Sequence, residues 1–232
     1  MKKILIILLV LVPFASHATR VNTYKILPIE GFQVLMDEDL IKANPRIEKA
    51  GIPNLKKCLK RIEKELPKAF ISFSKKDGMK IFISPSRKMF NRTGMFFVPK
   101  DNGSFRTGLE GLMSNAIVII DESIFMDADI LYYYLVHEFA HYYHFNVLGY
   151  TNKDIWHKYH AARAMPSYKI ANFDLSNHLE FFAELSAMFF TTRGELRKID
   201  KGAVSLMEKI WEPEGKGMMK YTPDWGVTSP RK

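Results

Sequence analysis

The chain has 232 residues, a formal net charge of +9 at neutral pH and a single cysteine, Cys58. One cysteine excludes an internal disulfide, and this length supports one sizeable hydrophobic core but is short for two. The basic residues are spread along the chain without the aromatic-basic pattern of a nucleic-acid-binding module. We therefore expect a basic surface and no nucleic-acid partner.

Residues 1–18 have the layout of a secretory signal peptide. Two lysines precede the apolar run Ile4–Val12, Pro13 follows, and Ser16 and Ala18 place small residues at a cleavage site. The run is shorter than the ~20 residues that a membrane-spanning helix needs. The pattern predicts an exported protein, periplasmic or secreted, without a stable membrane anchor.

Strand patterns come first in the remaining chain. Strand composition marks residues 31–36, and the segments 79–84 and 115–121 are also predicted strands. The stretch 91–111 is rich in glycine and turn residues and is predicted to be a long loop or an irregular hairpin.

Helical spacing of apolar residues dominates the second half. One helix is predicted earlier, between Asn54 as N-cap and Pro67, and the others follow the last strand. These later helices are predicted from Asp127 or Asp129 to Gly149, over 177–196 and over 202–212. We interpret 19–212 as a single α+β domain, a small sheet packed against helices, and 213–232 as a loosely ordered basic tail.

The stretch LVHEFAHYYHF, residues 135–145, contains His137, Glu138 and His141 in the order H-E-x-x-H. On a helix, positions four residues apart lie on one face, so both imidazoles can bind one metal ion. Glu138 is offset from His137 by about 100° and can hold a water without binding the metal. The surrounding residues are apolar, and unpaired polar groups are costly to bury there. The pattern predicts a zinc site with Glu138 as the general base.

A third protein ligand is needed, with the fourth position left open for water. The segment NHLEFFAELSAMFF offers Glu180 and Glu184, which are spaced four residues apart in an otherwise apolar helix. Surface carboxylates are the alternative, but a helix this apolar has few exposed faces. We predict Glu180 as the third ligand of one Zn²⁺ ion and Glu184 as an acceptor of a hydrogen bond from a metal-bound imidazole.

The motif HEFAH, followed 39 residues after His141 by the first Glu of EFFAE, resembles the zincin metallopeptidases. The resemblance is to the gluzincin-like group that includes anthrax lethal factor, the secreted Pro-Pro endopeptidases and the Mlc titration factor A peptidases. The segments 137–149 and 177–184 also resemble a broader set of secreted bacterial peptidases. The resemblance implies a zincin-like domain, with a small mixed sheet packed on an active-site helix and a C-terminal helical part. It also implies the same ligand roles and a peptide or protein substrate.

One position departs from that group, whose members place a tyrosine seven residues before the third-ligand glutamate to stabilise the oxyanion. The corresponding residue here is Phe173, which has no hydroxyl. Losing one oxyanion donor typically costs about 10²–10³ in rate. Tyr168 is the first candidate to replace this catalytic tyrosine, and His178 and His160 are further candidates.

The expected reaction is hydrolysis of a peptide bond by a zinc-activated water, with Glu138 as the residue that takes and later delivers the proton. The strand at 116–120 is expected to pair with an extended peptide, and the loop at 91–111 to rim the cleft. The five tyrosines between 132 and 143 are interpreted as helix packing along the approach to the site.

Three functions compete on this basis. The first is an exported zinc metallopeptidase. The second is a zinc-binding protein of the same fold that no longer cleaves and instead binds a peptide or protein, which Phe173 motivates. The third is a basic envelope-binding protein whose H-E-x-x-H is structural, which predicts that Glu180 lies far from His137 and His141.

Overall fold

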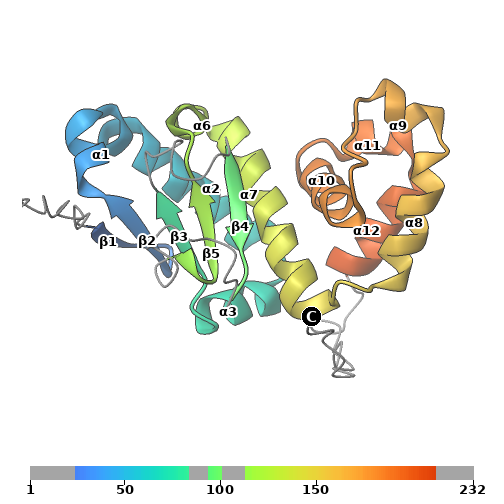
Figure 1. Ribbon diagram of the computed structural model, residues 1–232, viewed down its shortest axis with the longest axis horizontal. Helices are drawn as coiled ribbons and strands as arrows, with labels where there is room; N and C mark the ends of the chain where they lie inside the picture. The colour runs from blue at the N-terminus through green and yellow to red at the C-terminus, as the bar shows by residue number, and fades with distance from the viewer. Residues whose placement is uncertain (1–23, 84–93, 101–112, 213–232) are drawn as a thin grey trace, which may run out of the picture.

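The computed structural model describes residues 24–83, 94–100 and 113–212 (Figure 1). The predicted signal peptide and the predicted C-terminal tail both lie outside the described residues. Within those three ranges, no helix combines the length and the apolar character that crossing a membrane requires.

A five-stranded mixed sheet forms one half of the described structure (Figure 1). The strand order is β1-β2-β3-β5-β4, with β2, β3 and β5 parallel and the two edge strands antiparallel to their neighbours. The three predicted strands are confirmed as β2, β3 and β5, whereas β1 was not predicted and β4 lies in the stretch predicted as loop or hairpin. The bounds are β1 Tyr24–Ile29, β2 Phe32–Asp37, β3 Lys80–Ile83, β4 Met95–Val98 and β5 Ala116–Ile119.

Both faces of the central strands are buried, which explains their continuous apolar sequences. Alternate residues point to opposite faces, so Ile81 and Ile117 join the large core on the helical side. Phe82 and Val118 belong to a second, smaller apolar cluster on the other face. The fold is therefore mixed α and β, as the sequence predicted.

A first set of helical segments precedes α7 (Ala128–Tyr143) in the chain. The helix predicted from Asn54 begins earlier, and Asn54 is not its N-cap, because the Asn54 side chain instead donates to the Phe125 carbonyl at 3.0 Å. The helix that follows Pro67 was not predicted. The bounds are α1 Glu38–Ala43, the π-helical turn η1 Ile47–Gly51, α2 Ile52–Glu65, α3 Lys68–Lys76 and α6 Glu122–Met126.

The long helix α7 (Ala128–Tyr143) crosses the middle of the molecule between the sheet and the C-terminal helices (Figure 1). Of the two N-cap candidates, Asp127 is the N-cap, and it accepts backbone hydrogen bonds from Asp129 at 2.9 Å and Ile130 at 3.1 Å. The helix continues as the π-helical turn η2 (His144–Leu148) and stops at Gly149, also as predicted, where φ is +74°.

The C-terminal helices pack against the other side of α7. The predicted helix 177–196 is interrupted at Thr192, which caps α10, so its last part is a separate helix. Trp211 joins this half to α7, because its ring stacks on Tyr143 at 4.5 Å between centroids and its indole N–H donates to Ser186 at 3.0 Å. The bounds are α8 Lys153–Arg163, α9 Pro166–Ile170, α10 His178–Thr191, α11 Arg193–Ile199 and α12 Lys201–Trp211.

The contact between α2 and α7 gives a direct stability prediction. Leu59 of α2 is fully buried, so Leu59→Ala leaves a cavity and is expected to lower the free energy of unfolding by about 2–5 kcal/mol. Urea denaturation measures this loss, with the exposed neighbour Lys57→Ala as the control, which should change stability by less than about 0.5 kcal/mol. Equal losses in the two variants would contradict the packing.

Candidate metal centre

His137 and His141 project from the same face of α7, one turn apart, as the H-E-x-x-H spacing requires. Their Nε2 atoms lie 3.1 Å from each other, and the two side chains are 14% and 16% exposed. Both imidazoles are therefore shielded by the fold and still reach open space. This is the arrangement that the sequence predicted for the two histidines.

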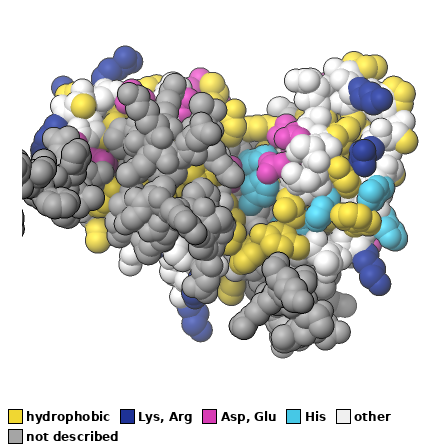
Figure 2. All heavy atoms as spheres, viewed as in Figure 1, with side chains coloured by type: hydrophobic (Ala, Val, Ile, Leu, Met, Phe, Trp, Pro, Cys, Tyr) yellow, Lys and Arg dark blue, Asp and Glu magenta, His cyan; other side chains and the backbone are white. Residues whose placement is uncertain are grey.

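Glu180, which is 39 residues after His141 in the chain, extends from α10 toward the two histidines. Its Oε2 lies 3.2 Å from Nε2 of His137 and 3.3 Å from Nε2 of His141. Asn177 caps α10 by accepting backbone hydrogen bonds from Leu179 and Glu180, which places Glu180 in the first turn of the helix. Figure 2 shows histidine and acidic side chains gathered where the two halves of the molecule meet.

These three residues form a group that could hold a metal ion. A tetrahedral ion with bonds of about 2.0–2.1 Å separates its ligand atoms by about 3.3–3.4 Å. The observed separations of 3.1, 3.2 and 3.3 Å form a nearly equilateral triangle of that size. Two nitrogens and one carboxylate oxygen at these separations fit three ligand atoms of one tetrahedral metal ion.

Glu184 lies one turn after Glu180 and supports the histidine rather than joining the triangle. Its Oε2 is 3.6 Å from Nδ1 of His137, while its Oε1 accepts a 2.5 Å hydrogen bond from the Tyr133 hydroxyl. A carboxylate on the Nδ1 side favours the proton on Nδ1 and leaves the Nε2 lone pair for a metal. Glu184 therefore lies on the Nδ1 side of His137, and its acceptance of a hydrogen bond from a metal-bound imidazole stays a prediction.

Glu138 is buried, with 3% of its surface exposed, and one carboxylate oxygen, Oε2, has no hydrogen-bond partner among the described residues. It lines the same cavity as the three ligand candidates. A buried carboxylate oxygen without a partner is costly, and a water or substrate group in the cavity would satisfy it. The position suits the general base that the sequence predicted.

His137 and Glu180 shift each other's pKa values. Burial lowers the pKa of His137, but hydrogen bonds to Glu180 and Glu184 and the nearby Glu138 charge outweigh it and raise that pKa to about 10. Hydrogen bonds from His137 and His141 hold the pKa of Glu180 well below its usual range. The protein therefore maintains a carboxylate beside the two rings, and a cation is favoured among them.

A cavity of about 440 Å³ opens onto the candidate metal-binding group of His137, His141 and Glu180. Strand β4 and the residue that follows it form one wall, and one tyrosine of α7 and one in the turn after η2 line the cavity as well. The lining residues are Met95, Phe96, Phe97, Pro99, Tyr134, His137, Glu138, His141, Tyr150, Leu179 and Glu180.

Tyr168, predicted as the substitute for the catalytic tyrosine, is not in this cavity. It is fully buried, and its hydroxyl donates to Oδ2 of Asp200 at 2.9 Å. The prediction for Tyr168 is wrong because a buried carboxylate already takes this hydroxyl. Phe173 is also directed into the core, where its ring packs on Tyr168 and Phe181, so this position would not present a hydroxyl to the cavity in any case.

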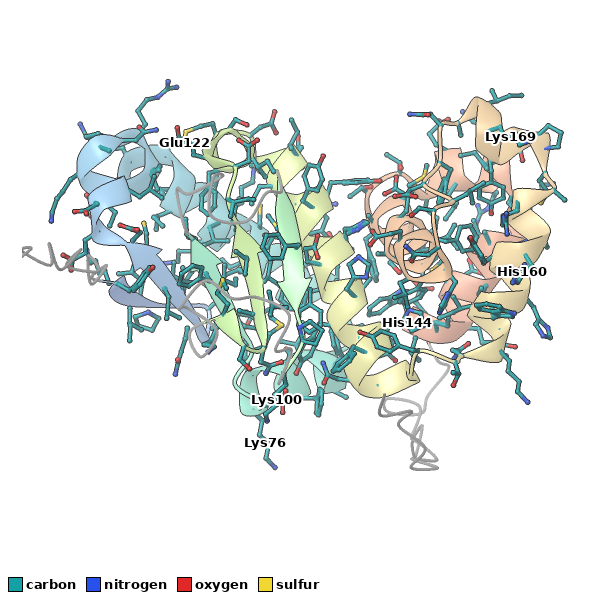
Figure 3. All side chains as sticks on the ribbon, in the orientation of Figure 1. Lys76, Lys100, Glu122, His144, His160 and Lys169 are labelled. Atoms are coloured by element: carbon teal, nitrogen blue, oxygen red, sulfur yellow. The ribbon has the colours of Figure 1, made fainter. Side chains whose placement is uncertain are left out.

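The two histidine candidates do not line the cavity either. His178 is bound through Nε2 to the Tyr150 carbonyl at 2.9 Å, and His160 packs against Trp156 on α8, far from α7 in Figure 3. His144, labelled at the end of α7 in Figure 3, is fully buried against Phe182. Burial and the neighbouring histidines lower the pKa of His144 to about 3, so it is a neutral core residue.

The strand that was expected to pair with a peptide substrate is not suited to that role in the structure. The strand at 116–120, β5, is paired on both sides, with β3 and β4, so it has no free edge for a peptide. The strand beside the cavity is β4, which was not predicted because its four residues lie in a stretch rich in glycine and turn residues. Tyr134, predicted to lie along the approach to the site, lines the cavity, as does Tyr150, which was not assigned to the site from sequence.

Comparison of the chain with protein-family models, with curated proteins and with solved structures finds no match. The zincin resemblance therefore stays a prediction from the motifs, and the site stands on its own geometry. The proximity of Glu180 to both histidines argues against the third function above, in which the motif is structural and Glu180 is distant.

The ligand assignment predicts how single substitutions change metal affinity. Glu184→Gln is expected to weaken Zn²⁺ binding by about 10–100-fold, because the partner of a ligand is lost. Glu180→Gln is expected to weaken it by more than Glu184→Gln, because a ligand itself is lost. Competition titration with a chromophoric chelator measures both, with the exposed Glu195→Gln of α11 as the control. Wild-type affinity in Glu180→Gln would remove Glu180 from the site.

Proposed function

We propose that the protein is an exported zinc-dependent metallopeptidase with a zincin-like fold. One observation carries the proposal: His137, His141 and Glu180 converge from two helices in a cavity that also contains the unpartnered carboxylate oxygen of Glu138. This combination supplies three ligands, an open position and a base within one cavity, which is what hydrolysis by a metallopeptidase requires.

A Zn²⁺ ion bound by these residues would polarise the scissile carbonyl and lower the pKa of the attacking water. Glu138 takes one proton from the water as its oxygen adds to the carbonyl carbon. The same carboxyl group then delivers this proton to the leaving nitrogen as the carbon–nitrogen bond breaks. Glu184 keeps the His137 ring in the orientation that directs Nε2 to the site.

The edge strand β4 supports a peptide as the substrate. In the sheet of the described residues, β4 is an end strand, paired with β5 on one side only, and it contacts α7. An extended peptide can pair with the free edge of such a strand while its scissile bond lies over the histidines. Met95 and Phe97 belong to the core on the α7 side, and both line the cavity.

The lining favours apolar residues on either side of the scissile bond. Met95, Phe96, Phe97, Pro99 and Leu179 contribute apolar surface, and the acidic and imidazole groups are confined to the reaction centre. Burial of apolar side chains against such walls contributes roughly 25 cal/mol per Å² of area removed from water.

The second candidate function is a zinc-binding protein of the same fold that binds peptides without cleaving them. Phe173 is the observation in its favour, since it has no hydroxyl and packs into the core. Both functions use the same metal site and the same strand, β4, for pairing with a peptide. They differ in whether the protein cleaves a bound peptide with Glu138 as the base.

Cleavage of a diverse peptide library by the zinc-loaded protein distinguishes the peptidase function from the binding function. Glu138→Gln keeps the size of the side chain but removes the base, so it is expected to lower the rate by about 10²–10⁴-fold while zinc still binds. Mass spectrometry detects the cuts, and metal analysis checks the zinc content. Glu195→Gln should cut like the wild type. A protein that binds one zinc ion and cuts nothing would favour the binding role.

A further inference from the structure

The cavity needs a hydrogen-bond donor for the oxygen that gains negative charge in the reaction, and Phe173, Tyr168, His160 and His178 do not line it. Apart from the metal-binding group and Glu138, the side chains that line the described cavity carry only two hydroxyl groups, those of Tyr134 and Tyr150. Among the side-chain hydroxyls of the described residues, the choice of donor therefore lies between these two tyrosines.

Tyr150 is held in place from three directions. Gly149, which precedes it, has a φ of +74°, a conformation that favours glycine, and this turns the chain sharply at the end of η2. The Tyr150 carbonyl accepts a 2.9 Å hydrogen bond from Nε2 of His178. Its ring packs edge-on against Phe145 at 4.9 Å and His144 at 6.0 Å between centroids. The backbone and ring are fixed by these contacts.

The hydroxyl of Tyr150, by contrast, is available. Within the described residues it has no hydrogen-bond partner, and 42% of the residue is exposed. The hydrogen bond from His178 ties Tyr150 to the first turn of α10, two residues before Glu180. The tyrosine is thus anchored to the helix that supplies the third ligand, which gives it a defined position relative to the reaction centre.

Tyr134 is held less firmly. It precedes His137 by one turn on the exposed side of α7, and its ring contacts the adjacent Tyr133 at 5.9 Å. It also lines a neighbouring cavity of about 500 Å³ together with Tyr132 and Thr191, so its ring stands between two open spaces. Preorganised donors stabilise developing charge best because they do not reorganise during the reaction, and this favours Tyr150.

We propose that Tyr150 is a catalytic residue whose hydroxyl donates a hydrogen bond to the carbonyl oxygen of the scissile peptide bond. As the water oxygen bonds to the carbonyl carbon and Glu138 takes the proton, the carbonyl π electrons move to the oxygen, and Tyr150 stabilises the charge there. No proton leaves Tyr150, and the hydrogen bond relaxes when the carbonyl re-forms and the amine departs. This proposal rests on the proposed peptidase function and replaces the tyrosine missing at Phe173.

The test compares Tyr150→Phe with Tyr134→Phe in the zinc-loaded protein. Tyr150→Phe removes only the hydroxyl, so it is expected to lower kcat by about 10²–10³-fold, with a small change in KM and unchanged zinc content. Tyr134→Phe is expected to lose far less. Urea denaturation checks that both variants are as stable as the wild type.

A binding measurement provides a readout that does not depend on turnover. The probe is a phosphinic peptide, in which a phosphinate replaces the scissile amide of the best-cleaved library peptide. Calorimetry should show that Tyr150→Phe binds it more weakly by the same factor as the loss in kcat/KM, because the analogue resembles the charged transition state.

The outcomes separate the two proposals. If wild-type protein cleaves peptides and Tyr150→Phe retains its kcat and its affinity for the analogue, the role of Tyr150 is wrong and the peptidase function stands. A loss confined to Tyr134→Phe would assign the donor to Tyr134 instead. A wild-type protein that binds zinc but cleaves no peptide would overturn the peptidase function, and the role of Tyr150 with it.

Discussion

The packing of α7 against α10 is the constraint on which the candidate metal centre depends. His137, Glu138 and His141 belong to α7, whereas Glu180 and Glu184 belong to α10, so no single segment contains the site. A slip of one turn moves a helix by 5.4 Å along its axis, which would carry Glu180 away from the histidines and replace it with Glu184. The Tyr133–Glu184 hydrogen bond and the contacts of Trp211 with Tyr143 and Phe182 oppose that slip.

The polar groups of the site lie in apolar surroundings, which makes their mutual positions important. Val136, Phe139 and Ala140 of α7 are fully buried, and Glu138 is almost fully buried among them. Unpaired charges in such an environment are unfavourable, so the helix tolerates these residues where they face one another or a cavity. A metal ion at this position would compensate the carboxylates directly. In the proposed function, the same desolvation would strengthen the action of these residues on a substrate.

The cavity has two different walls, and each suits a different task. The sheet contributes β4, which is an end strand among the described residues and whose apolar side chains line the cavity. The helical half contributes Glu180 and, through the turn at Gly149, the hydroxyl of Tyr150. In the proposed function, substrate pairing would come from β4, metal binding from α7 and α10, and charge stabilisation from the turn after η2.

The sequence by itself determined the features that depend on local spacing. His137 and His141 share one face of α7, and Glu180 and Glu184 share one face of α10, because a helix brings residues four apart onto one face. The tertiary structure alone decided the features that depend on long-range packing. Pairing on both sides closed β5 and left β4 as the edge, a buried aspartate took the Tyr168 hydroxyl, and the turn after η2 brought Tyr150 into the cavity. These features depend on which segments pack together in the fold. Residue spacing within one segment does not specify that packing.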